Sequence, residues 1–271
     1  MLTLVGNWEK AEVKRMRTGL LSVTFRKLSP NDIIKLVSEA GLEVIEWGGD
    51  IHVPHGDVKI ADEIGRKTRE VGIEVVSYGS YYYAGQQTTS TLQFEHVLAS
   101  ACALKAPAIR VWAGNQGSDE ASMARRQEVI LDARRIADLA QVHNTTIDFE
   151  FHGGTLTDST ESAVHLLQEI DHPNVRCNWQ PQTMESYDNR MASLLAILPW
   201  LANIHVFHWV NGERQSLSDG KSDWRQYLSI VMQTGKKPHV MLEFVKDDDP
   251  GQFVEDAETL KDTLSFISSS E

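Results

Sequence analysis

The chain has 271 residues, of which 26 are lysine or arginine and 38 are aspartate or glutamate, so its formal net charge is −12. This acidic balance argues against a nucleic-acid backbone as the main partner. The composition, 41% hydrophobic and 24% charged, is typical of a globular protein and excludes general disorder.

The ends and the cysteines of the chain give no sign of export. The amino end has only the short apolar start MLTLVG before charges arrive, without a secretory h-region. No run of about 18 apolar residues occurs, so no membrane-spanning helix is expected. Cys102 and Cys177 lie far apart and are interpreted as small core residues of a reduced protein. We therefore expect a cytoplasmic protein with no membrane partner.

Eight short apolar or β-branched runs alternate with longer segments whose apolar residues recur at helical spacing. The predicted strands are residues 19–25, 42–47, 73–78, 108–113, 145–151, 174–179, 203–209 and 239–245. A helix is predicted after each run, and the clearest amphipathic pattern spans residues 118–143. Capping residues predict helix starts at Ser29-Pro30, Ser118-Asp119, Asp158 and Ser222 or Asp223. Glycines predict helix ends at Gly41, Gly72 and Gly235.

Apolar strands that each precede a helix indicate a parallel sheet that is covered on both faces or closed on itself. Eight such units favour a single (β/α)8 TIM barrel, an α/β fold of roughly 250 residues. An open doubly wound sheet is the alternative, but the usual glycine-rich phosphate turn is replaced by FRKLSPND. We assign residues 19–271 to the barrel and residues 1–18 to a short N-terminal extension.

Two carboxylates lie inside otherwise apolar strands, where burial is costly without a partner. They are Glu150 in IDFEF and Glu243 in VMLEFV, both near the carboxyl ends of predicted strands, where barrel enzymes carry their chemistry. With a histidine they would suit a divalent cation, which takes oxygen and nitrogen ligands. The alternative is an ion pair with a strand-end arginine such as Arg26, Arg110 or Arg176.

Aromatic residues and histidines also gather at the predicted strand ends. The tryptophans are Trp47, Trp112, Trp179 and Trp209. Flat indole faces suit the C–H face of a sugar, whereas the alternative for each tryptophan is packing in the core. His205 and His208 are three residues apart, so in a regular strand they face opposite sides. We expect a carbohydrate pocket at this end of the barrel.

These strand-end motifs resemble the xylose isomerase-like barrels, which include sugar-phosphate isomerases and epimerases, ketose 3-epimerases, inosose-converting enzymes and endonuclease IV. The resemblance covers nearly the whole chain and rests on FEFHGG, HPNVRCNWQP, NIHVFHW, VMLEFV and DGKSDW. The segments SVTFR, IEWGGDIHVP, SYGSYY, RVWAG and FHGGTLTDS resemble a bacterial sugar-phosphate isomerase/epimerase branch.

The resemblance implies a site for one divalent metal ion: Mn, Mg, Co or Zn. In that family a Glu, an Asp, a His and a second Glu at the ends of strands five to eight hold the metal. The corresponding residues here are Glu150, Gln180, His205 and Glu243. Gln180 departs from the family pattern, because an amide replaces a carboxylate and removes one negative charge, which weakens metal binding. Asn178 is the alternative ligand.

The resemblance implies a sugar isomerase or epimerase in which Glu150 and Glu243 act as the acid/base pair, with an enediolate intermediate. The predicted substrate contacts are Trp47, His52, Arg110, Trp112, His152, Trp179 and His208. A small-molecule carbohydrate is the expected partner. The oligomeric state stays open, with a homodimer or a homotetramer as candidates.

Three other functions are weighed against this one. A dehydratase or lyase acting on a keto-sugar or keto-inositol could use the same enediolate. A DNA-repair enzyme of the endonuclease IV type is disfavoured by the net charge of −12 and by too few metal ligands. A sugar-binding barrel without catalysis is kept open by Gln180.

Overall fold

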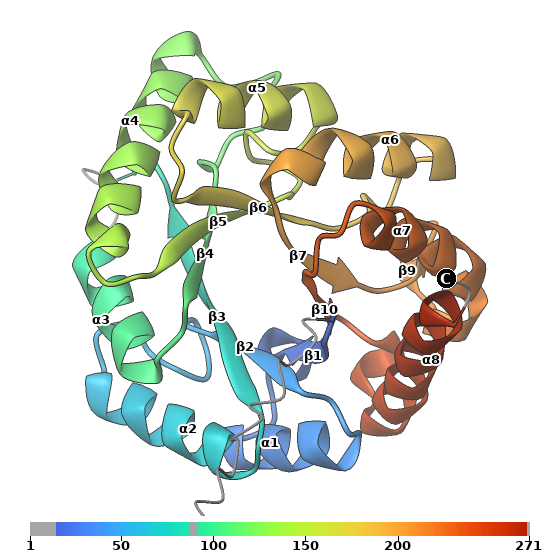
Figure 1. Cartoon of the computed structure of the whole chain (residues 1–271). Coiled ribbons are helices and arrows are strands. Elements are labelled where there is room, and N and C mark those ends of the chain that lie inside the picture. The colour runs from blue at the N-terminus through green and yellow to red at the C-terminus, as the bar shows by residue number, and fades with distance from the viewer. Residues whose placement is uncertain (1–14, 87–90, 270–271) are drawn as a thin grey trace, which may run out of the picture.

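The fold is taken from a computed structural model, which describes residues 15–86 and 91–269. The barrel strands are β1 (Thr18–Leu21), β2 (Val44–Gly48), β3 (Glu74–Tyr83), β4 (Ala108–Trp112), β5 (Thr146–Glu150), β6 (Val175–Trp179), β7 (Leu201–Val206) and β10 (His239–Leu242). All neighbouring pairs are parallel, and they close in the order β1-β10-β7-β6-β5-β4-β3-β2 (Figure 1). The prediction of a (β/α)8 TIM barrel is confirmed.

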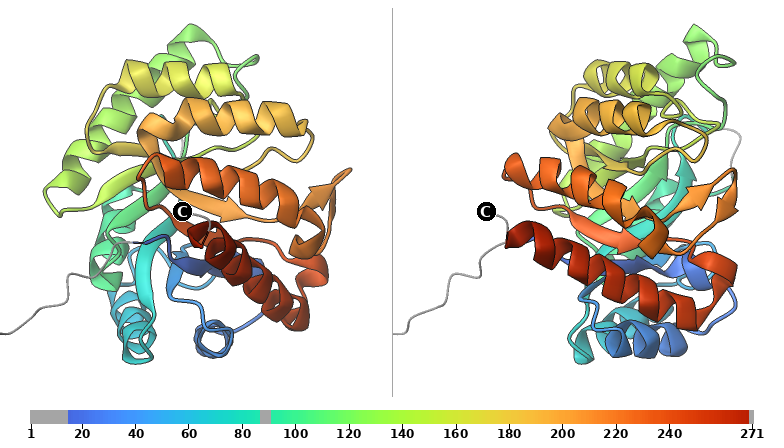
Figure 2. Two further views of the ribbon diagram at one scale, coloured as in Figure 1. Left: turned by 45° about the vertical axis from the view of Figure 1, so that its right-hand side comes forward. Right: turned by 90° about the vertical axis from the view of Figure 1, so that its right-hand side faces the viewer.

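Helices surround the barrel, as Figure 1 shows. They are α1 (Pro30–Glu39), α2 (Val58–Glu70), α3 (Phe94–Leu104), α4 (Met123–Gln141), α5 (Thr160–Ile170), α6 (Tyr187–Ile197), α7 (Lys221–Gln233) and α8 (Pro250–Ser268). A small antiparallel hairpin, β8 (Trp209–Val210) with β9 (Glu213–Arg214), follows β7. Figure 2 shows this hairpin at the carboxyl end of the strands, opposite the end of α8. None of the helices within the described ranges is long and apolar enough to cross a membrane.

The first predicted strand, residues 19–25, is strand only in its first half. β1 passes directly into a 3-10 turn, η1 (Ser22–Phe25). A side-chain hydroxyl takes the place of a strand hydrogen bond there, because Ser22 Oγ accepts from Gly48 N at 2.8 Å.

Side-chain caps set several helix starts, but the predicted start at Ser222 or Asp223 is wrong, because α7 begins at Lys221 without a side-chain cap. Ser29 caps α1 as predicted, accepting from Asp32 N at 3.3 Å. The predicted start of α4 at Ser118 is wrong, because Ser118 N donates to Asp158 at 2.8 Å and Ser122 caps the helix instead. The predicted helix ends are confirmed by positive φ angles at Gly41, Gly72 and Gly235.

The barrel has two apolar layers. The larger one fills the space between strands and helices, and the smaller one fills the barrel interior. The interior layer consists of Leu21, Val23, Val44, Val76 and Met241, with Tyr81 and Phe244 packed on it. Because side chains fill the interior, polar groups that bind a substrate have to lie above this layer, at the carboxyl ends of the strands.

Ion pairs join neighbouring segments at the amino ends of the barrel strands. Arg15 contacts Glu43 and Arg17 contacts Glu74, each at 2.6 Å. Most of the predicted N-terminal extension, residues 1–14, lies outside the described residues. His239 begins β10 at this end, and burial together with nearby Arg17 lowers the pKa of its imidazole to about 4.

We expect the pH dependence of stability to be weaker in His239→Gln than in the unsubstituted protein. The folded pKa of about 4 lies below the usual 6.5, so the unfolded state binds the proton first. Stability is therefore lost as pH falls from about 6.5 towards 4, by up to about 3 kcal/mol. Urea unfolding at pH 7 and pH 4.5 measures this loss. Equal losses in both proteins would contradict the assignment.

Candidate active site

Ionisable side chains converge where the barrel strands end. Glu46 is on β2, Arg110 on β4, Glu150 at the end of β5 and His205 on β7, while Glu243 directly follows β10. All five side chains are at most 5% exposed. A buried group of this kind is costly unless its charges are paired or bind a cation.

Arg110 joins two of the carboxylates. Its Nε donates to Glu46 at 2.7 Å, and its Nη1 donates to Glu150 Oε2. Trp112 Nε1 donates to the same Glu150 oxygen at 2.5 Å. Burial disfavours ionisation of Glu150, but the guanidinium of Arg110 and the nearby His205 outweigh it and lower the pKa of Glu150 to about 2. Glu150 is therefore a carboxylate held firmly in place. An ion pair with a strand-end arginine was the alternative interpretation of Glu150, and the structure contains this pair with Arg110.

The other oxygen of Glu150 faces a second group of polar atoms. Gln180, one residue beyond β6, donates from Nε2 to Glu150 Oε1 at 3.3 Å. His205 Nδ1 lies 3.2 Å from Gln180 Oε1, 3.7 Å from Glu150 and 3.6 Å from Glu243. Burial opposes protonation of His205, but Glu243 and Glu150 outweigh it and raise the pKa of the imidazole.

The donor set fits a divalent cation. Ligand atoms of Glu150, His205 and Glu243 all lie within 4.8 Å of one another. The three buried carboxylates Glu46, Glu150 and Glu243 carry more negative charge than Arg110 neutralises. A divalent ion would balance that charge, and the amide oxygen of Gln180 is close enough to complete the set.

The sequence model of the xylose isomerase-like TIM barrel family matches residues 34–267, which is most of the chain. The chain belongs to this family. A protein from Bacillus anthracis named 3-dehydroshikimate dehydratase is 29% identical over 203 residues, 70% of this chain and 71% of that protein.

Two solved structures share the fold of this xylose isomerase-like barrel. The crystal structure of a probable 3-DHS dehydratase from Bacillus anthracis has a TM-score of 0.75 at 22% identity, covering 91% of this chain and 99% of the other. The structure of a 3-keto-D-glucoside 4-epimerase from E. coli has a TM-score of 0.72 at 17% identity, covering 93% and 100%.

Two predicted substrate contacts lie together at the mouth of the xylose isomerase-like barrel. The rings of Trp112 and His152 are 5.0 Å apart between centroids and tilted by 31°. Tyr81 and Tyr83 pack edge-on against the same indole, at 5.1 and 4.8 Å. Tyr81 also covers the guanidinium of Arg110 at 5.0 Å. The aromatic wall of the mouth is therefore built around Trp112.

Trp47 and Trp179, by contrast, do not line the mouth, and this part of the prediction is corrected. Both are fully buried in the layer between strands and helices. Trp47 Nε1 donates to Thr68 on α2 at 3.2 Å, and Trp179 Nε1 donates to Ser193 on α6 at 2.9 Å. Their indoles face outward because strand side chains alternate between the two sides of a sheet.

His52 and His208 are also kept apart from the cluster. His52 Nδ1 lies 2.9 Å from Ser22 Oγ on the turn after β1. His208 packs against Gly220, at the start of α7, where a side chain in place of the glycine hydrogen would collide with the imidazole. Asn178, the alternative ligand, accepts from Asn203 N at 3.1 Å within the sheet.

Glu46 and Tyr81 are the site residues that the sequence analysis did not select. Glu46 had a usable signal, a carboxylate in the apolar run LEVIEW, as in the strands of Glu150 and Glu243. Its Oε2 is buried and has no hydrogen-bond partner among the described residues. Tyr81 had no such signal, because its position depends on a positive φ of 54° that no local pattern marks.

Proposed function

We propose that this barrel is a divalent-metal-dependent sugar isomerase or epimerase, which moves a proton on the carbon next to a carbonyl group. The observation that carries the proposal is the grouping of Glu150, His205 and Glu243 within 4.8 Å at the barrel mouth. The aromatic wall around Trp112 adds a surface against which the C–H face of a sugar can pack.

Glu150, Gln180, His205 and Glu243 would hold the metal. Bound there, a divalent ion would supply Lewis acidity, which polarises carbonyl and hydroxyl oxygens and makes the adjacent C–H more acidic. Arg110 fixes Glu150 from the other side. The orientation of Glu150 as a metal ligand is thus set by a neighbouring side chain.

Glu243 is the group we assign to remove the proton. Both oxygens of Glu150 accept hydrogen bonds, from Gln180 on one side and from Arg110 and Trp112 on the other. Glu243 lies 3.6 Å from His205 and receives none of those three bonds. Its carboxylate takes the proton, the C–H electron pair forms an enediolate, and the proton returns to the neighbouring carbon for isomerisation. Delivery of a proton from water to the opposite face of the same carbon, with the first proton left on Glu243, gives epimerisation.

Dehydration is a second candidate, favoured by the 29% identity to the protein named 3-dehydroshikimate dehydratase. In that reaction the C–H electron pair forms a carbon–carbon double bond as a β-hydroxyl group leaves. The hydroxyl takes a proton and departs as water. His152, whose ring lies 5.0 Å from that of Trp112 at the mouth, is the group we assign to give that proton.

The Glu243→Gln variant is expected to lose exchange of the substrate α-proton with D2O by about a thousandfold, because the amide cannot accept the proton. The probes are D-fructose, D-psicose and 3-dehydroshikimate, followed by NMR with added Mn, Mg, Co or Zn. Products of unchanged mass indicate isomerisation, and loss of water indicates dehydration. Trp179→Phe, outside the mouth, is the control.

Unchanged exchange in Glu243→Gln would remove Glu243 from this role, and Glu150→Gln is measured in parallel. Sugar binding without exchange in the unsubstituted protein, under every metal, would favour a non-catalytic binding barrel instead.

A further inference from the structure

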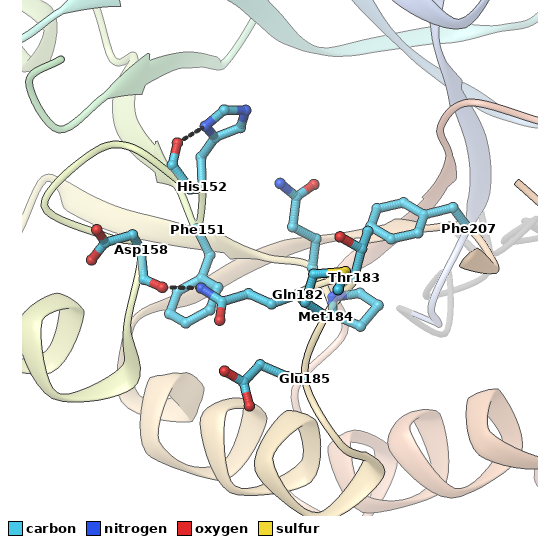
Figure 3. A pocket seen from close by; sticks show the side chains of 11 residues that line it. Phe151, His152, Asp158, Gln182, Thr183, Met184, Glu185 and Phe207 are labelled. Atoms are coloured by element: carbon cyan, nitrogen blue, oxygen red, sulfur yellow. Dashed lines mark hydrogen bonds between the residues drawn. The ribbon is translucent and has the colours of Figure 1, made fainter. Parts of the chain in front are cut away.

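A cavity of about 350 Å³, here called the side pocket, opens beside the ionisable cluster at the ends of β5, β6 and β7. His152 and Gln180 belong to its lining, so it is continuous with the candidate active site. Figure 3 shows Phe207 on one side, with Phe151 and Asp158 on the other. A group attached to a substrate at the cluster can therefore extend into the side pocket.

Part of the side pocket is apolar and open at its rim. Phe207 and Pro181 line it, and Met184 stands at its edge with 81% of its surface exposed. A methionine this exposed beside a cavity offers adaptable contact area to an apolar group. Burying such a group here would remove both surfaces from water.

Hydrogen bonds hold the loop after β6, which carries Pro181 and Met184. Gln182 Nε2 donates to the backbone oxygen of Asp158, and both residues line the side pocket (Figure 3). Arg190 on α6 donates to the backbone oxygens of Gln182 and Thr183, both at 2.9 Å. The wall is therefore preformed, which lowers the entropy lost on binding.

The charge of the side pocket is unfavourable to anions. Asp158 and Glu185 are carboxylates in its lining, and no lysine or arginine is found among the described residues that line it. The nearby Arg190 is turned to backbone oxygens. A phosphate or carboxylate group would lose part of its hydration there, near two carboxylates and without a cationic side chain among the described lining residues to pair with.

We propose that the side pocket binds an uncharged, partly apolar substituent, such as the aglycone of a glycoside, and thereby selects unphosphorylated substrates over sugar phosphates. The inference rests on the proposed function for the position of the reacting carbonyl at the cluster. It goes beyond that function by naming the substrate class, an uncharged glycoside or keto-glycoside.

Binding of three probes tests the proposal, measured by tryptophan fluorescence and by calorimetry on the metal-treated protein. Phenyl β-D-glucopyranoside is expected to bind about tenfold more tightly than methyl β-D-glucopyranoside, because its ring is buried. D-Glucose 6-phosphate is expected to bind at least about tenfold more weakly than the phenyl glucoside. Phe207→Ser should remove the preference for phenyl over methyl.

Two matched variants test the effect of charge at the side pocket. Met184→Lys, at the rim of the side pocket, should tighten binding of D-glucose 6-phosphate, because it supplies the missing cation. Met123→Lys makes the same change at a residue that is 79% exposed, begins α4 and is not part of the pocket lining. It should leave all three affinities unchanged.

Equal affinities for the phenyl and methyl glucosides, tighter binding of D-glucose 6-phosphate, or no binding of the phenyl glucoside would overturn the inference. Exchange of the α-proton in D2O is measured on the same preparation. Exchange without a phenyl preference leaves the proposed function standing and removes the inference. A phenyl preference without exchange for any ketone removes the proposed function and leaves the side pocket as a binding site.

Discussion

The Glu150→Ala/Glu243→Ala double variant is expected to lose the divalent metal that the unsubstituted protein retains at about one equivalent. The two carboxylates supply the negative charge of the predicted site, and His205 and Gln180 are neutral or weak ligands without them. Elemental analysis for Mn, Mg, Co and Zn, after gel filtration into metal-free buffer, measures the difference.

Two further variants make this comparison specific. Glu43→Ala/Glu74→Ala removes two carboxylates at the opposite end of the barrel, where they pair with Arg15 and Arg17, and should keep the metal. Gln180→Asp adds a carboxylate beside His205 and should bind the metal more tightly. A double variant at Glu150 and Glu243 with undiminished metal content would contradict the site. So would an unsubstituted protein that resists loading with all four ions.

The barrel could be predicted from the sequence because its signal is repeated eight times along the chain. Each apolar run that precedes an amphipathic segment reports the same packing requirement, so errors at single boundaries do not change the fold. The turn η1 and the start of α4 were missed for a local reason. The side chains of Ser22 and Ser122 decide those boundaries, through hydrogen bonds that hydrophobic periodicity does not record.

The site was predictable in part, and strand alternation separates the correct residues from the misplaced ones. Arg110 and Trp112 are two residues apart and both face the mouth, as do Glu150 and His152. Trp47 follows Glu46 by one residue, so it must face outward if the carboxylate faces inward.

The same rule applies to Trp179 and His208. Trp179 precedes the inward Gln180 by one residue, and His208 follows the inward His205 by three. The sequence therefore predicts which side of the sheet each strand residue faces, but not which residues of different strands contact one another. That Glu46 and Glu150 share one guanidinium depends on the register of β2, β4 and β5 around the barrel.

Arg110→Met is expected to lower the free energy of unfolding by about 3–5 kcal/mol in the presence of EDTA, because it leaves buried carboxylates without their counter-ion. Glu46 and Glu150, each at most 5% exposed, would then lose the guanidinium that lies between them. Urea unfolding at pH 7 measures the loss. At pH 5 the loss should shrink, because carboxylates that repel one another bind protons more readily.

A double variant and a surface control separate charge from packing in this result. Glu46→Gln/Arg110→Met removes one of the stranded charges and should recover part of the stability, whereas a pure packing defect would not respond. Arg66→Met breaks an exposed pair with Glu70 and should cost less than about 1 kcal/mol. A loss of less than about 1 kcal/mol for Arg110→Met in EDTA would contradict the role of Arg110 as counter-ion.

Added divalent metal should restore stability to Arg110→Met if the remaining oxygens of Glu150 and Glu243 bind it. The ion pair and the metal site are thus compatible, because Arg110 holds one oxygen of Glu150 and leaves the other facing Gln180 and His205.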